Sequence, residues 1–160
     1  MTCLEAHAST SPCGPALVAI LEDDRHPYRR SAQWCVLDMF EDLPAFCPDE
    51  ETQTRAVEAI RRLVMAAEDD YCRTVFKAGV VLGGHVCTDQ AADALLACIL
   101  DAGPIGRRSA MHAVFHLAEW RPDDRPRIVA ALRQAAEVEP LPVLRAYAAS
   151  MARDVESGGP

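Results

Sequence analysis

Residues 88–120 read TDQAADALLACILDAGPIGRRSAMHAVFHLAEW, and this stretch decides the fold. Thr88 before Asp89 is typical of a helix N-terminus. Gly103-Pro104 ends that helix, because glycine tolerates the left-handed cap and proline cannot extend the helix before it. The pattern predicts two helices joined by a tight turn. Their expected buried residues recur at helical spacing: Ala92, Leu95, Leu96, Ile99 and Leu100, then Ala110, Ala113, Val114 and Leu117.

Similar pairs of amphipathic helices are predicted on both sides of this stretch. Their expected ranges are 14–23 with 27–43, 49–67 with 71–84, and 122–139 with 143–155. Such a pair cannot bury all its apolar surface until neighbouring pairs pack against it. We therefore expect an all-α chain whose helical hairpins stack into a solenoid, with residues 43–50 as the longest connector between pairs.

The second helices of the four pairs align in phase. Four columns of this alignment contain only apolar residues or glycine: Ala32, Val75, Ala110 and Ala148; Cys35, Ala78, Ala113 and Met151; Val36, Gly79, Val114 and Ala152; Met39, Leu82, Leu117 and Val155. We expect these columns to face inward. Glycines at 79, 83 and 84 weaken the fourth helix, which indicates either close approach of a neighbouring helix or a flexible seam.

The composition fits one folded domain, since half of the 160 residues are apolar and a quarter are charged. A net charge of −8 disfavours nonspecific attraction to nucleic acid and anionic lipid, and suits either a soluble protein or one that meets a basic partner. The seven cysteines are odd in number and form no C-x-x-C motif. Cys35, Cys72 and Cys98 are expected to be small buried hydrophobes. With no apolar run near the roughly 20 residues of a membrane span, a reducing cytoplasm is the expected location.

Residues 15–156 resemble the HEAT repeat family. An acid at or near each turn precedes an arginine by several residues: Asp23 or Asp24 with Arg30, Asp69 or Asp70 with Arg73, Asp101 with Arg108, and Glu139 with Arg145. The resemblance implies a right-handed α-solenoid of about four hairpins over residues 14–156, between a leader at 1–13 and a tail at 157–160. It also implies that these acids and arginines connect successive repeats, and that the second helices line the concave side.

A second stripe of residues on the second helices faces away from the inward columns. Its members are Arg30, Trp34, Asp38, Arg73, Lys77, Arg108, His112 and His116. A polar row with an interleaved tryptophan suits a groove that binds a protein partner, because arginine and aromatic side chains supply most hot spots. The alternative is an ordinary solvated face whose arginines form salt bridges between repeats.

His112 and His116 stand four residues apart, so both imidazoles could share a metal ion with His85 and Cys87. The spacing matches no zinc motif, and the H-A-V-F-H sequence lacks the glutamate of H-E-x-x-H. The alternative is that these histidines are exposed or lie at an edge of the core. We expect no metal and no cofactor.

Enzymatic alternatives rest on Trp34 and Asp38, one helical turn apart. Some HEAT-like DNA glycosylases hold a cationic base between such a pair, but they need a basic groove for phosphates, and Trp34 could instead pack against Phe46. We therefore expect a non-catalytic protein-binding module, such as an inhibitor, an immunity-type protein or a scaffold. A HEAT-like glycosylase or a chromophore lyase subunit remains the rival interpretation.

Overall fold

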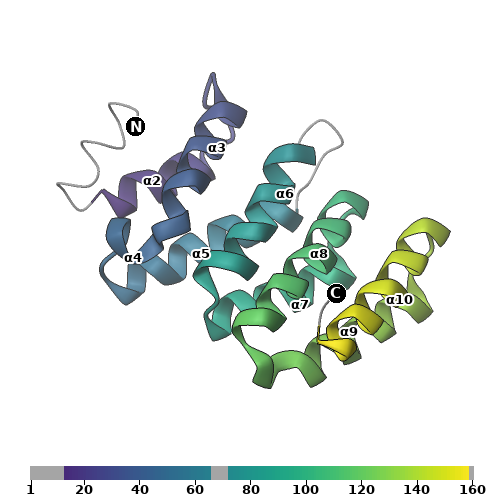
Figure 1. The fold of residues 1–160 in the computed structure, drawn as a ribbon. Helices are drawn as coiled ribbons and strands as arrows, with labels where there is room; N and C mark the ends of the chain where they lie inside the picture. Colours follow the sequence, from purple (N-terminus) through teal and green to yellow (C-terminus); the bar gives the residue numbers. More distant parts are fainter. Residues whose placement is uncertain (1–12, 66–71, 159–160) are drawn as a thin grey trace.

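The computed structural model describes residues 13–65 and 72–158, which contain helices and no strand (Figure 1). The principal helices are α2 (Gly14–Glu22), α3 (Arg29–Met39), α5 (Glu50–Met65), α6 (Cys72–Val80), α7 (Asp89–Asp101), α8 (Pro104–Trp120), α9 (Arg125–Val138) and α10 (Pro142–Ser157). The prediction of an all-α chain is confirmed. Most of the predicted leader, the last two residues of the predicted tail, and the turn acids Asp69 and Asp70 lie outside the described residues.

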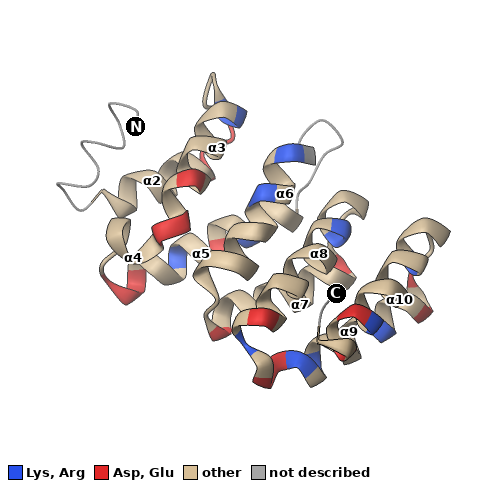
Figure 2. Ribbon diagram, viewed as in Figure 1, with Lys and Arg blue, Asp and Glu red and all other residues tan. Residues whose placement is uncertain are grey.

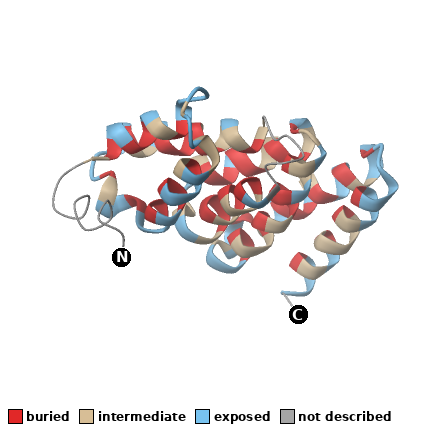
Figure 3. Ribbon diagram, turned by 90° about the horizontal axis from the view of Figure 1, so that it is seen from above, coloured by how far each residue is buried: buried red, intermediate tan, exposed pale blue. Residues whose placement is uncertain are grey.

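The helices pack in a regular order along the chain. The first helices contact one another in sequence, α2 with α5, α5 with α7 and α7 with α9. The second helices do the same, α3 with α6, α6 with α8 and α8 with α10, and Figure 1 shows them side by side. Figure 3 shows the buried residues gathered on the helix surfaces that face each other. One hydrophobic core therefore extends from α2 to α10.

The helix predicted over 27–43 is shorter in the structure. α3 ends at Met39, and a 3-10 turn, η1 (Phe40–Asp42), leads into the short helix α4 (Leu43–Phe46). Pro44 explains the new start, because proline fits the first turn of a helix but not its interior. Part of the predicted connector at 43–50 is therefore helical.

The inward columns are largely buried in α6, α8 and α10, but α3 differs. Cys35 is exposed, so its predicted burial is wrong, whereas Cys98 is fully buried. Ala32 in α3 and Met151 in α10 are only partly buried. α3 is rotated about its axis so that it buries Gln33, Val36, Leu37 and Met39. Packing on α2 explains this rotation, because the Gln33 side chain donates a hydrogen bond to the Leu21 carbonyl at 3.3 Å.

The glycines of the fourth predicted helix allow close contact with α8. A Cβ on Gly83 would lie 2.2 Å from the Ala113 carbonyl oxygen, and one on Gly79 would lie 2.4 Å from the Ser109 hydroxyl. That hydroxyl donates to the Val75 carbonyl at 2.8 Å. The close-approach interpretation is therefore confirmed. After α6 the chain continues as a π-helical turn, η3 (Val81–Val86), two residues beyond the predicted end.

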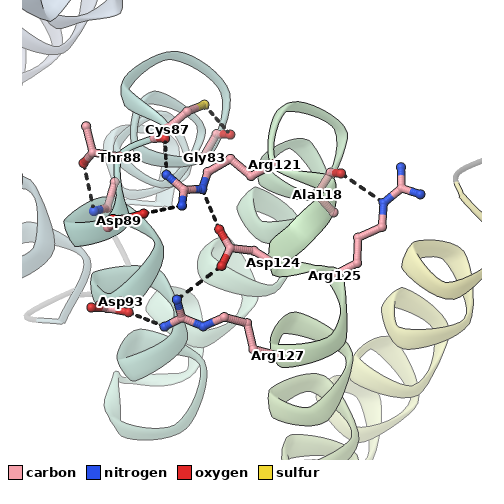
Figure 4. Close-up of polar contacts among 11 residues, drawn as sticks. Gly83, Cys87, Thr88, Asp89, Asp93, Ala118, Arg121, Asp124, Arg125 and Arg127 are labelled. Carbon is pink, nitrogen blue, oxygen red and sulfur yellow. Dashed lines mark hydrogen bonds and ion pairs between the residues drawn. The ribbon is translucent and has the colours of Figure 1, made fainter.

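Arginines join α7 to the start of α9 (Figure 4). Arg121 pairs with the carboxylates of Asp89 and Asp124 and donates to the Cys87 carbonyl at 3.0 Å. Arg127 pairs with Asp124 at 3.2 Å and with Asp93. The hydrogen bond from Arg121 is the main reason that the pKa of Asp124 lies below its usual range. Charged side chains thus hold neighbouring helix pairs in register.

The acid and arginine positions implied by the family resemblance differ in detail from the contacts observed. Glu139 pairs with Arg107, which was not among the implied arginines. Arg145 donates instead to the backbone carbonyl of Glu139 at 3.0 and 2.8 Å. In the first pair, Asp24 lies 3.5 Å from Arg29. Neighbouring residues of a helix point in different directions around its axis. The Arg107 side chain can therefore reach the turn that holds Glu139, whereas that of Arg108 points elsewhere.

Among the described helices, none has both the length and the apolar character that crossing a membrane requires.

Candidate partner-binding site on the second helices

All eight predicted site residues lie on α3, α6 and α8, and none belongs to the fully buried core. We call them the second-helix face: Arg30, Trp34, Asp38, Arg73, Lys77, Arg108, His112 and His116. The structure brings six of them into two contact groups, one of Trp34, Asp38 and Lys77 and the other of Arg108, His112 and His116. In the first turns of α3 and α6, Arg30 is partly buried and Arg73 is exposed.

The first group joins α3 to α6 through Lys77. Its ammonium pairs with the Asp38 carboxylate and with Glu41 of η1 at 2.9 Å, and it lies 4.9 Å from the centre of the Trp34 ring. Burial by itself lowers the pKa of Lys77, but the hydrogen bonds to Asp38 and Glu41 outweigh it and raise the pKa. Lys77 is therefore a charged, largely covered link between helices, with 13% of its side chain exposed.

This first group bears on the glycosylase interpretation. That chemistry needs the Asp38 carboxylate to face a cationic base beside Trp34, whereas here Lys77 occupies the position of the cation. The salt-bridge alternative accounts for these residues at this end of the face.

The second group is centred on Arg108. Its guanidinium carbon lies 5.2 Å from the centre of the Phe76 ring on α6 and 5.8 Å from that of Tyr147 on α10. Arg108 is nevertheless exposed, and no carboxylate of residues 13–65 or 72–158 pairs with it. Two rings on different helices thus hold the guanidinium while its N–H groups stay accessible.

The two histidines of the face contact each other. The His112 Nε2 lies 3.3 Å from the His116 Nε2, and the His112 ring centre lies 5.5 Å from that of Phe76. Burial lowers the pKa of His112, and the nearby His116 and Arg108 lower it further. His112 is therefore neutral at pH 7, since an unperturbed histidine already titrates at roughly 6.5. The His116 Nδ1 in turn lies 3.5 Å from the Glu119 Oε2.

The other proposed metal ligands do not complete a site with these histidines. His85 is exposed, and the Cys87 thiol contacts the Gly83 carbonyl at 3.2 Å. Within the described part of the chain, no group of three His, Cys, Asp or Glu side chains is placed to hold a metal ion.

Sequence reasoning missed three residues of these groups: Glu41, Phe76 and Tyr147. Column alignment places Phe76 opposite Met111, but Met111 is fully buried, and Phe76 contacts Arg108 and His112 on another face of α8. One signal was present in the sequence, because Trp34, Phe76 and Tyr147 each follow a second-helix arginine within four residues.

The chain matches no protein-family model, no curated protein sequence and no solved structure.

Proposed function

We propose that this chain is a HEAT-like, right-handed α-solenoid of about four hairpins that binds a protein partner through the second-helix face. Support for the solenoid comes from the order of contacts, in which first helices pack on first helices and second helices on second helices along the chain. An open stack of this kind leaves one row of helices available to a partner.

The observation that carries the binding proposal is the placement of Arg108. It is exposed and lies between the rings of Phe76 on α6 and Tyr147 on α10. Three neighbouring second helices, α6, α8 and α10, thus contribute to one polar and aromatic patch. Arginine and aromatic side chains dominate the energetic centres of protein interfaces. A guanidinium already held in place loses less conformational freedom on binding than one free to rotate. An inhibitor or immunity-type role is one form of this proposal.

Site-specific photo-cross-linking in cells of the native host tests the proposal. A photoreactive amino acid at Arg73 or His116 lies on the second-helix face, whereas one at Arg133 or Glu137 lies on α9 among the first helices. We expect the first two positions to cross-link one discrete protein and the α9 positions to give no such product. Equal cross-linking from both sets, or none from the face in a variant with unchanged circular dichroism, would contradict the proposal.

A further inference from the structure

The second helices carry a charge opposite to that of the whole chain. α3, α6, α8 and α10 together contain eight Arg or Lys and four Asp or Glu, a formal charge of +4 in a chain of −8. In Figure 2, Lys and Arg lie near the same end of α3, α6 and α8. Lys77 and Arg107 of this set are already paired with carboxylates, so the cations that a partner would meet are exposed arginines such as Arg73, Arg108 and Arg145.

Arg73, Arg108 and Arg145, near the starts of α6, α8 and α10, have no carboxylate partner within the described ranges, and neither does Arg153 near the end of α10. All four are exposed, and the first three occupy three neighbouring second helices. A shortage of acids does not explain this, because the chain has 24 Asp and Glu against 16 Lys and Arg. Other arginines, such as Arg107 on α8 and Arg127 on α9, do pair with carboxylates.

A stabilising effect on their own helices does not explain why these arginines are present. α6, α8 and α10 have no acid in their first turns, whereas α5 begins with Glu50 and Glu51 and α7 with Asp89. A cation near a helix N-terminus opposes the helix dipole, and a carboxylate there is favoured. Within the part of the chain that the structure describes, the first turns of α6, α8 and α10 thus lack the carboxylates that would stabilise these arginines, and a partner could supply them.

We propose that Arg73, Arg108 and Arg145 form a receptor row for an acidic, extended segment of a protein partner, with Arg108 as its centre. This inference rests on the proposed function and names the chemistry of the partner. A guanidinium binds a carboxylate through two parallel hydrogen bonds, and the rings of Phe76 and Tyr147 hold Arg108 for that contact.

The spacing of the second helices determines how far apart the carboxylates of the partner segment should lie. Axes of packed helices lie about 8–10 Å apart, and a polyproline II segment rises about 3.1 Å per residue with three residues per turn. Carboxylates at every third residue of such a segment therefore lie on one side and match arginines on neighbouring second helices. A single-stranded nucleic acid is the rival occupant of this row.

Fluorescence anisotropy with the full-length chain tests the row. The probes are a labelled peptide with aspartate at every third position among glycine and serine, the same composition with the aspartates contiguous, and an asparagine version of the first. We expect the spaced peptide to bind best, and Arg108→Gln to weaken it about tenfold. Arg108→Lys should weaken it too, because lysine keeps the charge but loses the planar fork. Arg133→Gln on α9 is the matched control and should leave affinity unchanged.

Equal binding of the three peptides, or no loss in a correctly folded Arg108→Gln variant, would overturn the receptor row. So would tighter binding of a single-stranded DNA oligonucleotide at physiological salt. The experiments can reject the receptor row and the proposed function independently. Cross-linking from Arg73 and His116 without peptide binding would retain the binding face and reject the acidic segment, whereas absence of face cross-links rejects the proposed function itself.

Discussion

The Arg107 guanidinium on α8 binds both carboxylate oxygens of Glu139 in the turn between α9 and α10, at 2.6 and 2.9 Å. Arg107 also donates to the Ala102 carbonyl at 2.6 Å, and the Leu141 backbone N–H donates to Glu139 at 3.0 Å. Only 2% of the Glu139 side chain is exposed. One buried ion pair therefore links the turns of two neighbouring helix pairs.

Glu139→Gln should lower the free energy of unfolding by about 3 kcal/mol, because it leaves the Arg107 charge largely buried without its counter-charge. Urea unfolding monitored by circular dichroism measures this. The control is Glu156→Gln, which breaks the exposed pair with Arg133 and should cost at most about 1 kcal/mol. Equal losses in the two variants would show that the Glu139 pair is not buried in solution.

The stability difference between wild type and Glu139→Gln should depend on pH. The hydrogen bond from Arg107 is the main reason that the pKa of Glu139 lies below its ordinary range. The contribution of the pair is therefore complete above roughly pH 4.3, where an unfolded glutamate is ionised, and is lost as the pH falls through the folded-state pKa. A difference that grew on acidification would contradict this assignment.

Gly83→Ala should destabilise the chain by about 3 kcal/mol, because the new Cβ would meet the backbone carbonyl of Ala113 and force α8 away. Gly84→Ala is the matched neighbour. Its Cβ would lie 3.8 Å from the His116 Cβ, an ordinary contact, and the change should be neutral or stabilise by up to about 1 kcal/mol. Thermal melts of both variants check this. Equal destabilisation would mean that the contact between η3 and α8 is looser than described.

Cys35 should react with iodoacetamide at pH 8 at least about tenfold faster than Cys98 in the folded chain, since the thiolate is the reactive form. Cys35 is exposed, whereas burial raises the pKa of Cys98 to about 12 and that of Cys47 to about 11. Peptide mass spectrometry measures each site separately. In urea the rates should converge, and fast labelling of Cys98 without denaturant would contradict its burial.

The sequence predicted the helices well where the caps, breaks and spacing of apolar residues all lie within one helix pair. In residues 88–120 the Thr88 cap, the position of the break at Gly103-Pro104 and the buried Leu95, Ile99 and Leu117 were predicted correctly. The left-handed cap expected at Gly103 was wrong, because its backbone is extended with φ −61°. Each depends on backbone conformation or on periodicity within one helix, which is local information. Cys35 was predicted wrongly because α2 sets the rotation of α3 through packing, and no pattern within α3 records that contact.

For the candidate site, the sequence by itself determined which helices carry Arg73, Lys77, Arg108 and the two histidines, because a 3.6-residue period places them away from the inward columns. Only the tertiary structure decided their partners: Lys77 meets Asp38 and Trp34, Arg108 meets Phe76 and Tyr147, and Arg107 rather than Arg108 binds Glu139. The physical reason is the packing of neighbouring helices against each other. Contacts such as Gly79 and Gly83 against α8 fix how the helices lie, and they join residues some 30 positions apart in the chain.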